Sequence, residues 1–106
     1  MSSHFRKSAY PDPVSQAAVR ETFPGFSFGT FVDPPGQVWP DFVHDTDEFV
    51  VVAEGDMEIV VDGESERCGP GDLALIPAGA RHTLRTSKTH GSKWYYGYGR
   101  FGADHG

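Results

Sequence analysis

Two stretches of the chain decide its fold: GQVWPDFVHDTDEFVVVAEG, residues 36–55, and GDLALIPAGARHTLRT, residues 71–86. Both are rich in aromatic and β-branched residues, and glycines mark three of their four ends, as is typical of short strands joined by tight turns. On two neighbouring strands this spacing directs His44, Glu48 and His82 toward one point. Two imidazoles and one carboxylate are a ligand set of catalytic zinc and of non-haem iron. The two stretches therefore predict a small β-barrel with a metal site.

The β pattern extends from residue 26 to the C-terminal region. Runs of aromatic and β-branched residues alternate there with Gly, Pro and Asp clusters, at intervals of about eight to twelve residues that favour a sandwich or barrel. The turn segments 33–36 and 69–72 supply residues that tolerate positive φ or fix φ near −65°. We expect eight strands, near residues 26–32, 37–43, 47–53, 56–62, 64–68, 72–76, 80–86 and 93–100.

The N-terminal part has a different composition. Pro11 and Pro13 interrupt it, and residues 13–23, PVSQAAVRETF, contain good helix formers. Because 106 residues are enough for one core but not for two, we expect an N-terminal segment over 1–25 and one barrel domain over 26–102. One short helix is expected in the N-terminal segment, with these apolar residues at helical spacing: Val14, Ala17, Ala18 and Phe23.

Composition excludes several classes of function. The net charge of −6 and the pI near 5.2 argue against nucleic-acid binding, which usually needs a basic face. No apolar run approaches the ~18 residues of a membrane span, and the first residues contain no apolar core of a secretory signal. Cys68 is the one cysteine, so no internal disulfide forms, and it is expected to fill a core position. A cytoplasmic protein is expected.

Alternation along the strand at 47–53 predicts an unusual burial pattern. If Glu48 faces the barrel interior, Val50 and Val52 do so too, and Phe49 and Val51 point outward. An outward apolar pair needs cover, because contiguous exposed apolar surface usually marks an interface. The N-terminal segment or a second subunit would supply that cover.

The two stretches also resemble the two motifs of the cupin superfamily. The first motif, G(X)5HXH(X)3–4E(X)6G, is matched by His44, Glu48 and Gly55, with Phe42 in place of its leading His. The second motif, G(X)5PXG(X)2H(X)3N, is matched by Gly71, Pro77, Gly79 and His82, with Thr86 where Asn is usual. With both motifs in order, the chain resembles small single-domain cupins of the cupin_2 conserved-barrel group.

This resemblance implies an all-β, double-stranded β-helix of the jelly-roll type, usually dimeric, with a divalent metal ion (Fe, Mn, Ni or Zn) inside the barrel. His44, Glu48 and His82 would be its ligands. Because Phe42 removes one ligand of the pattern, three outcomes stay open: three protein ligands with water, recruitment of another group, or loss of the metal. Asp41 is a poor replacement because strand alternation puts it, like Asp45, on the face opposite to His44.

Simpler explanations exist for the same residues. A His and a Glu in a barrel can form a buried hydrogen-bonded pair, and the glycines and proline of the motifs suit tight corners without any ligand. Arg81 and Arg85 flank His82 on the outward face, so they are not expected to bind an internal anion. The remaining histidines lie near the termini or in a polar loop, where we expect solvent exposure: His4, His90 and His105.

An aromatic strand near the C-terminus provides candidate pocket walls. Trp94, Tyr95, Tyr96 and Tyr98 bring rings to both faces, and most of them are expected to pack in the core. One face would line the mouth of the pocket, where a Tyr hydroxyl positions a substrate oxygen. Further apolar walls are expected from Phe28, Trp39 and Phe42.

Two classes of function fit these features. One is a metal-dependent enzyme, a dioxygenase, isomerase or lyase, which acts on a small organic molecule in the pocket. The other is a non-enzymatic module that binds or senses such a molecule. The fold does not separate the two classes, and no catalytic base is assigned. A homodimer is expected in either case.

Overall fold

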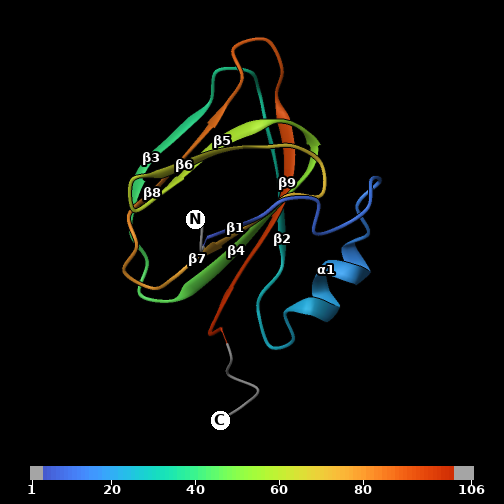
Figure 1. The fold of residues 1–106 in the computed structure, drawn as a ribbon, viewed down its shortest axis with the longest axis vertical. Helices are drawn as coiled ribbons and strands as arrows, with labels where there is room; N and C mark the ends of the chain where they lie inside the picture. Colours follow the sequence, from blue (N-terminus) through green and yellow to red (C-terminus); the bar gives the residue numbers. More distant parts are fainter. Residues whose placement is uncertain (1–3, 102–106) are drawn as a thin grey trace.

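This computed structural model describes residues 4–101, which contain the strands β1 to β9 and the helix α1 (Figure 1). The eight predicted strands are all present, with ends shifted by a few residues. β1 was not predicted, since it has only two residues. The elements are β1 (Phe5–Arg6), α1 (Gln16–Thr22), β2 (Gly29–Asp33), β3 (Val38–Phe42), β4 (Asp47–Gly55), β5 (Met57–Val61), β6 (Glu64–Cys68), β7 (Leu73–Ile76), β8 (His82–Thr86) and β9 (Ser92–Gly99).

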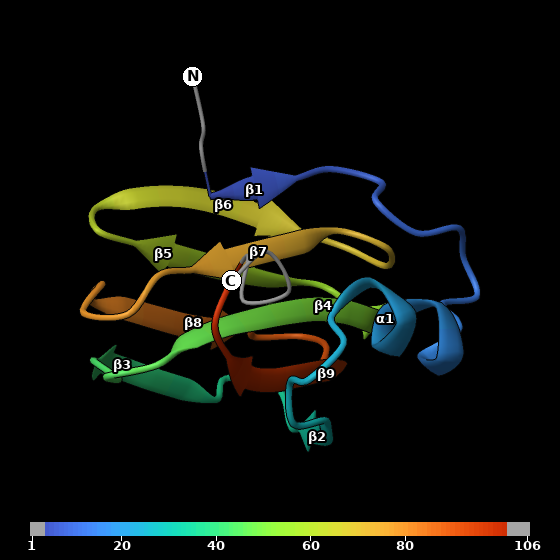
Figure 2. The same ribbon diagram turned by 90° about the horizontal axis from the view of Figure 1, so that it is seen from below.

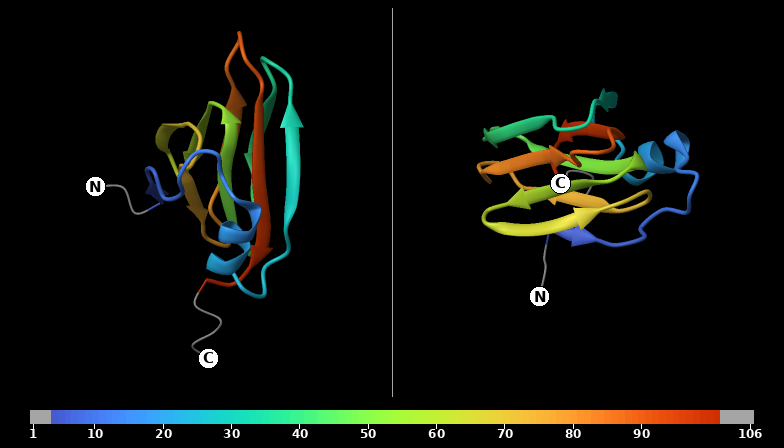
Figure 3. Two further views of the ribbon diagram at one scale, coloured as in Figure 1. Left: turned by 90° about the vertical axis from the view of Figure 1, so that its right-hand side faces the viewer. Right: turned by 90° about the horizontal axis from the view of Figure 1, so that it is seen from above.

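The strands form two antiparallel sheets that face each other, as the predicted jelly roll requires. One sheet has the order β1-β7-β4-β9-β2 and the other β3-β8-β5-β6. Figure 2 shows the two sheets edge-on, with α1 on the outer side of the five-stranded sheet. Figure 3 shows β2 and β3 together at one side of the sandwich, where each is an edge strand. The expected fold class is confirmed.

The alternation of β4 separates two apolar clusters, as predicted. Val50 and Val52 point between the sheets, and Phe49 and Val51 point to the outer face, yet all four are almost fully buried. The cluster between the sheets contains these buried residues: Phe5, Val50, Val52, Met57, Ile59, Val61, Cys68, Ala74, Ile76, Ala80, Leu84 and Trp94.

The cover over the outer face of β4 comes from the N-terminal segment, the first of the two sources considered. The side chain of Ser15 caps α1 by accepting a hydrogen bond from the backbone N–H of Ala18. Val19 is fully buried, and the ring of Phe23 stacks on Phe49 at a centroid distance of 4.4 Å. Ala17 was wrongly predicted on the apolar face: the helix begins only at Gln16, and Val19 takes the buried position instead.

The carboxylate of Asp72 ties the start of the chain to the turn before β7. It accepts hydrogen bonds from the backbone N–H of Ser8 (2.7 Å) and of Gly69 (2.8 Å), and it pairs with the ammonium of Lys7 (2.8 Å). Burial opposes ionisation of this carboxyl group, but the hydrogen bonds and the Lys7 charge outweigh burial and lower the pKa of Asp72. Asp72 is therefore a charged anchor of β1.

Cys68 is fully buried, as expected, and burial raises the pKa of its thiol to about 12. It is an inert core residue. Among residues 4–101, no helix is both long enough and apolar enough to cross a membrane.

Candidate metal centre

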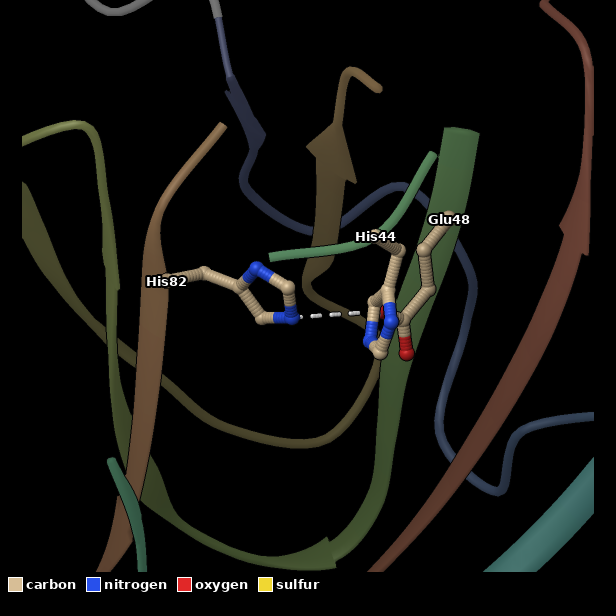
Figure 4. Close-up of side chains that lie close together, drawn as sticks. All are labelled: His44, Glu48 and His82. Atoms are coloured by element: carbon tan, nitrogen blue, oxygen red, sulfur yellow. Dashed lines mark ion pairs between the residues drawn. The ribbon is translucent and has the colours of Figure 1, made fainter. Parts of the chain in front are cut away.

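Three different parts of the fold supply His44, Glu48 and His82 (Figure 4). Glu48 is the second residue of β4 in the five-stranded sheet, and His82 is the first residue of β8 in the opposite sheet. His44 lies in the connection from β3 to β4. The predicted site residues therefore meet between the two sheets. The expectation that they lie on two neighbouring strands was wrong, because β4 and β8 belong to opposite sheets and His44 lies on neither strand.

The ligand atoms of these side chains all lie within 4.8 Å of one another. Nε2 of His82 is 3.3 Å from Oε1 of Glu48, and Nε2 of His44 is 3.7 Å from the same oxygen. Ligands bound at 2.0–2.2 Å from one metal ion are themselves about 3 Å apart. The observed spacing thus fits a shared cation after a small contraction.

The second stretch holds the first in place through its Pro-Ala-Gly turn. The backbone N–H of Gly79 donates to the carbonyl of His44 (2.8 Å), and that of Ala78 donates to Oδ1 of Asp47 (2.7 Å). The segment from His44 to Asp47, which directly precedes Glu48, is thus tied to the turn that leads to His82. Such support is what a preorganised ligand set needs.

The hydrogen bonding of His82 determines what its Nε2 offers to the site. Nδ1 lies 3.1 Å from the carbonyl oxygen of Ala80, which can only accept, so Nδ1 carries a proton. In the neutral ring, Nε2 is then unprotonated, and its lone pair faces the carboxylate of Glu48. Burial opposes protonation of His82, but Glu48 and the Ala80 carbonyl outweigh burial and raise its pKa. The site therefore attracts a cation to Nε2, either a proton or a metal ion.

Glu48 is the group that most needs a cation. Its side chain is 5% exposed, and its buried Oε1 has no hydrogen-bond partner, since the 3.3 Å approach of His82 lacks hydrogen-bond geometry. Burial of an uncompensated carboxylate is costly, and a bound cation offsets that cost. The residues present thus fit a metal ion.

A cavity of about 170 Å³ opens over this cluster. Trp39 and Phe42 line it, as predicted, but Phe28 does not: its ring packs on Phe49 and Tyr95 in the outer cluster. Sequence reasoning missed Phe31, because the inward face of β2 depends on its pairing with β9. Besides the three candidate ligands, the lining consists of Phe31, Trp39, Phe42, Leu84, Trp94 and Tyr98.

Tyr98 is the tyrosine that lies at the candidate ligands. Its ring meets the His44 ring edge-on at a centroid distance of 5.1 Å. Burial and the charge of Glu48 raise the pKa of its phenol to about 12. The phenol therefore stays protonated at neutral pH and can donate a hydrogen bond.

The family model described as "Cupin domain", Cupin_2, matches residues 29–96 of the chain, more than half of its length. These residues include both motifs and all three candidate ligands. The chain belongs to the Cupin_2 family.

Two curated proteins match this cupin over about half of its chain. An endoribonuclease YbeY from Myxococcus xanthus is 37% identical over 59 residues, which are 56% of this chain and 20% of that protein. A quercetin 2,3-dioxygenase from Bacillus subtilis is 43% identical over 51 residues, 47% of this chain and 15% of that protein. The chain thus spans a fifth or less of the length of these relatives.

Solved structures share the fold of this cupin. TT1209 from Thermus thermophilus is 27% identical with a TM-score of 0.62, and the match covers 67% of this chain and 70% of that one. The polyketide cyclase RemF from Streptomyces resistomycificus is 26% identical with a TM-score of 0.62, over 69% of this chain and 54% of that one.

The cupin site departs from its motif at Phe42, and the side chain faces the cavity. The ring centroid of Phe42 is 6.1 Å from that of His44 and 6.2 Å from that of His82. Neither Asp41 nor Asp45 belongs to the ligand cluster, in agreement with the alternation argument. An aromatic side chain therefore lines the cavity at the motif position of the fourth ligand.

The other charged residues that were weighed lie away from the cluster. Arg81 and Arg85 are exposed, as predicted, and Arg85 pairs with Glu58 at 2.8 Å. His90 is exposed, as expected, and His105 lies outside the described residues. His4 was wrongly expected in solvent: its side chain is 17% exposed, 3.8 Å from Glu64, with Nδ1 near the Leu75 carbonyl, because β1 joins the sheet.

Proposed function

We propose that this cupin binds one divalent metal ion through His44, Glu48 and His82, and that it is a metal-dependent enzyme acting on a small organic molecule in the cavity. The observation that carries the proposal is the buried Oε1 of Glu48, which lacks a hydrogen-bond partner and faces Nε2 of both histidines. Of the three outcomes considered for the site, we favour three protein ligands with water. A mixed nitrogen and oxygen set suits Fe, Mn, Ni or Zn.

The residues around the ligands suit a substrate that has one polar end. When bound, the metal would supply a Lewis acid or a site for O₂. His82 is oriented by the Ala80 carbonyl, and the protonated phenol of Tyr98 is available to donate a hydrogen bond to a substrate oxygen. Aromatic and aliphatic side chains line the rest of the cavity and would pack against the apolar part of such a substrate.

The names of two similar proteins support this class of function. One is a quercetin 2,3-dioxygenase and the other a polyketide cyclase, so related barrels belong to enzymes of small organic molecules. A third similar protein, from Myxococcus xanthus, is named an endoribonuclease, but we do not propose nuclease activity for this chain. A net charge of −6 disfavours a nucleic-acid substrate.

A non-enzymatic binding module is the second candidate. The observation that favours it is Phe42, an apolar ring at the fourth ligand position. In addition, the described lining offers no general base apart from Glu48 and the histidines, all of which the metal would use. The homodimer and the cytoplasmic location expected from the sequence stay predictions, to be tested by light scattering and cell fractionation.

Metal analysis tests the site. Protein purified without chelators should contain close to one equivalent of metal per chain, and His82→Ala should remove it because this ligand is buried in a rigid strand. His90→Ala is the matched control, since His90 is exposed in a polar loop and should leave the metal content unchanged. Equal metal content in His82→Ala and the parent protein would refute the site.

A turnover assay separates the enzyme from the binder. Small enolic, phenolic and keto compounds would be incubated with protein loaded with Fe(II), Mn(II), Ni(II) or Zn(II). We expect turnover of at least one compound that is lost in His82→Ala. Stoichiometric metal binding together with silence across the panel would assign the binding module instead.

A further inference from the structure

Both tryptophans of the chain line the cavity, and they come from opposite sheets. Trp39 belongs to β3 and Trp94 to β9, and Phe31 on β2 contacts both, with ring centroids at 5.7 Å from Trp39 and 5.1 Å from Trp94. On the other side of Trp39, the Phe42 ring continues toward His44. A continuous aromatic surface therefore leads to the candidate metal site.

A single buried carboxylate fixes the two tryptophans. Asp33 is 6% exposed, and its Oδ2 accepts hydrogen bonds from Nε1 of Trp39 (3.0 Å) and from Nε1 of Trp94 (2.9 Å). The metal site makes no use of Asp33. Because Asp33 holds both indole N–H groups, the tryptophans offer only their carbon surfaces to a ligand. The two indoles are thus held in place by one shared acceptor.

Size and charge limit what this cavity accepts. Its volume of about 170 Å³ is close to the ~150 Å³ of an engineered apolar cavity that binds benzene. Among the described residues that line it, none is Lys or Arg, so an anionic substituent away from the candidate ligands would have no partner. The polar side chains, His44, Glu48, His82 and Tyr98, gather at one end.

We propose that the cavity is a slot for one uncharged aromatic ring, whose oxygen substituent points to His44, Glu48 and His82, and that Asp33 is the positioning residue that sets the slot. The oxygen end of this proposal rests on the proposed metal site, whereas the ring end does not. The ligand class is therefore a phenol or a similar one-ring compound with an oxygen donor.

Intrinsic tryptophan fluorescence reports ligand binding in the slot directly, because both tryptophans of the chain line it. With metal-free protein, excited where the ligands do not absorb, we expect phenol and toluene to change the emission and to bind about tenfold more tightly than cyclohexanol, since stacking needs a flat ring. Equal binding of cyclohexanol would overturn the slot. Tetramethylammonium tests a cation-binding aromatic cage instead, and tighter binding of it than of phenol would also overturn the proposal.

Metal addition separates this proposal from the proposed function. With Zn²⁺ bound, the affinity for phenol should rise about tenfold or more through its oxygen, while toluene should stay unchanged. If the protein takes up no metal, the metal site is refuted. The aromatic slot is then decided by the ring selectivity of the metal-free protein alone. Uptake of metal with no preference for flat rings would keep the site and refute the slot.

Variants at position 33 test the positioning role. Asp33→Ala should lower the preference for phenol over cyclohexanol by about fivefold, because the indoles lose their shared acceptor. Asp33→Asn keeps an oxygen that accepts two hydrogen bonds and should retain the preference within about twofold. An unchanged preference in Asp33→Ala would refute the role, as would an equal loss in both variants. If Asp33→Ala does not fold, Trp39→Phe replaces it: this variant keeps an aromatic ring but loses the N–H that Asp33 holds, so it should lower the same ratio, and an unchanged ratio would refute the positioning role.

Discussion

Phe42 gives the most direct test of the site geometry. Its ring faces the cavity beside His44 and His82, and its backbone pairs with that of His82. Phe42→His would therefore add a nitrogen ligand to the three already present. We expect metal affinity to rise by about tenfold or more, as measured by competition with a chromogenic chelator.

The neighbouring residue supplies the matched control for this substitution. Val43 is half exposed and does not line the cavity, so Val43→His should leave the metal affinity unchanged. If Phe42→His gives no gain over Val43→His, position 42 does not reach the metal. The three-ligand arrangement would then need a different explanation.

Sequence patterns identified His44, Glu48 and His82 because strand alternation and motif spacing are local properties. Asp33 could not be found in this way. It was read as part of a turn, since its partners Trp39 and Trp94 become neighbours only when the two sheets close. Phe28 was misplaced because β2 begins only at Gly29, so Phe28 precedes the strand and packs against the outer cluster.

The anchor of β1 on the turn before β7 predicts an acid-sensitive step in stability. The folded-state pKa of Asp72 lies below its ordinary value of 3.8. Its stabilisation is therefore complete above the unfolded-state pKa and is lost as the pH falls through the lowered folded-state pKa. Asp72→Asn should reduce the free energy of unfolding at neutral pH by about 1–3 kcal/mol and flatten its decline in acid, as measured by urea unfolding between neutral and acidic pH.

Asp45→Asn is the control for the anchor, because Asp45 is exposed. Its pH profile should follow that of the parent protein. The two backbone N–H donors, from Ser8 and Gly69, account for most of the expected effect, since the Lys7 side chain is half exposed and its charge is screened. An acid profile of Asp72→Asn identical to that of the parent would remove Asp72 as the anchor.

The helix α1 is expected to contribute to stability through one fully buried side chain. Val19→Ala removes two methyl groups beneath the helix and should cost about 1–3 kcal/mol. Val32→Ala makes the same chemical change at a position that is 74% exposed, and it should stay within about 0.5 kcal/mol of the parent. Urea unfolding measures both variants. Equal effects would show that α1 does not hold the outer face of β4.

The strands were easier to predict than the ends and faces of the helix. Alternation and turn residues recur in every strand of the barrel, whereas α1 has only seven residues and few apolar positions that define its face. A small shift in the start of such a helix decides whether Ala17 or Val19 takes the buried position. β1 has two residues and is defined by its pairing with β7 rather than by its own sequence.

The candidate ligands lie on both sheets, so metal binding should stabilise the whole molecule. Glu48 belongs to the five-stranded sheet and His82 to the four-stranded sheet. At a free metal concentration of 100 times Kd, binding contributes about 2.7 kcal/mol, which corresponds to a rise in Tm on the order of 10–20 °C for a domain of this size. Differential scanning calorimetry with and without metal measures the shift.

His82→Ala should abolish this shift, and removal of metal by a chelator should reverse it. His90→Ala again serves as the control, because its imidazole is exposed and distant from the cluster in sequence. A rise in Tm that persists in His82→Ala would show that the ion binds elsewhere on the molecule.

The division of the ligands between β4 and β8 also bears on maturation in the cell. While the polypeptide is being synthesised, the carboxylate of Glu48 emerges well before the imidazole of His82, and nothing holds the two near each other until the sheets pack. Ion capture would then be the last event of biogenesis. The metal acquired would be chosen by the finished barrel from the ions around it, rather than by the nascent chain at the ribosome.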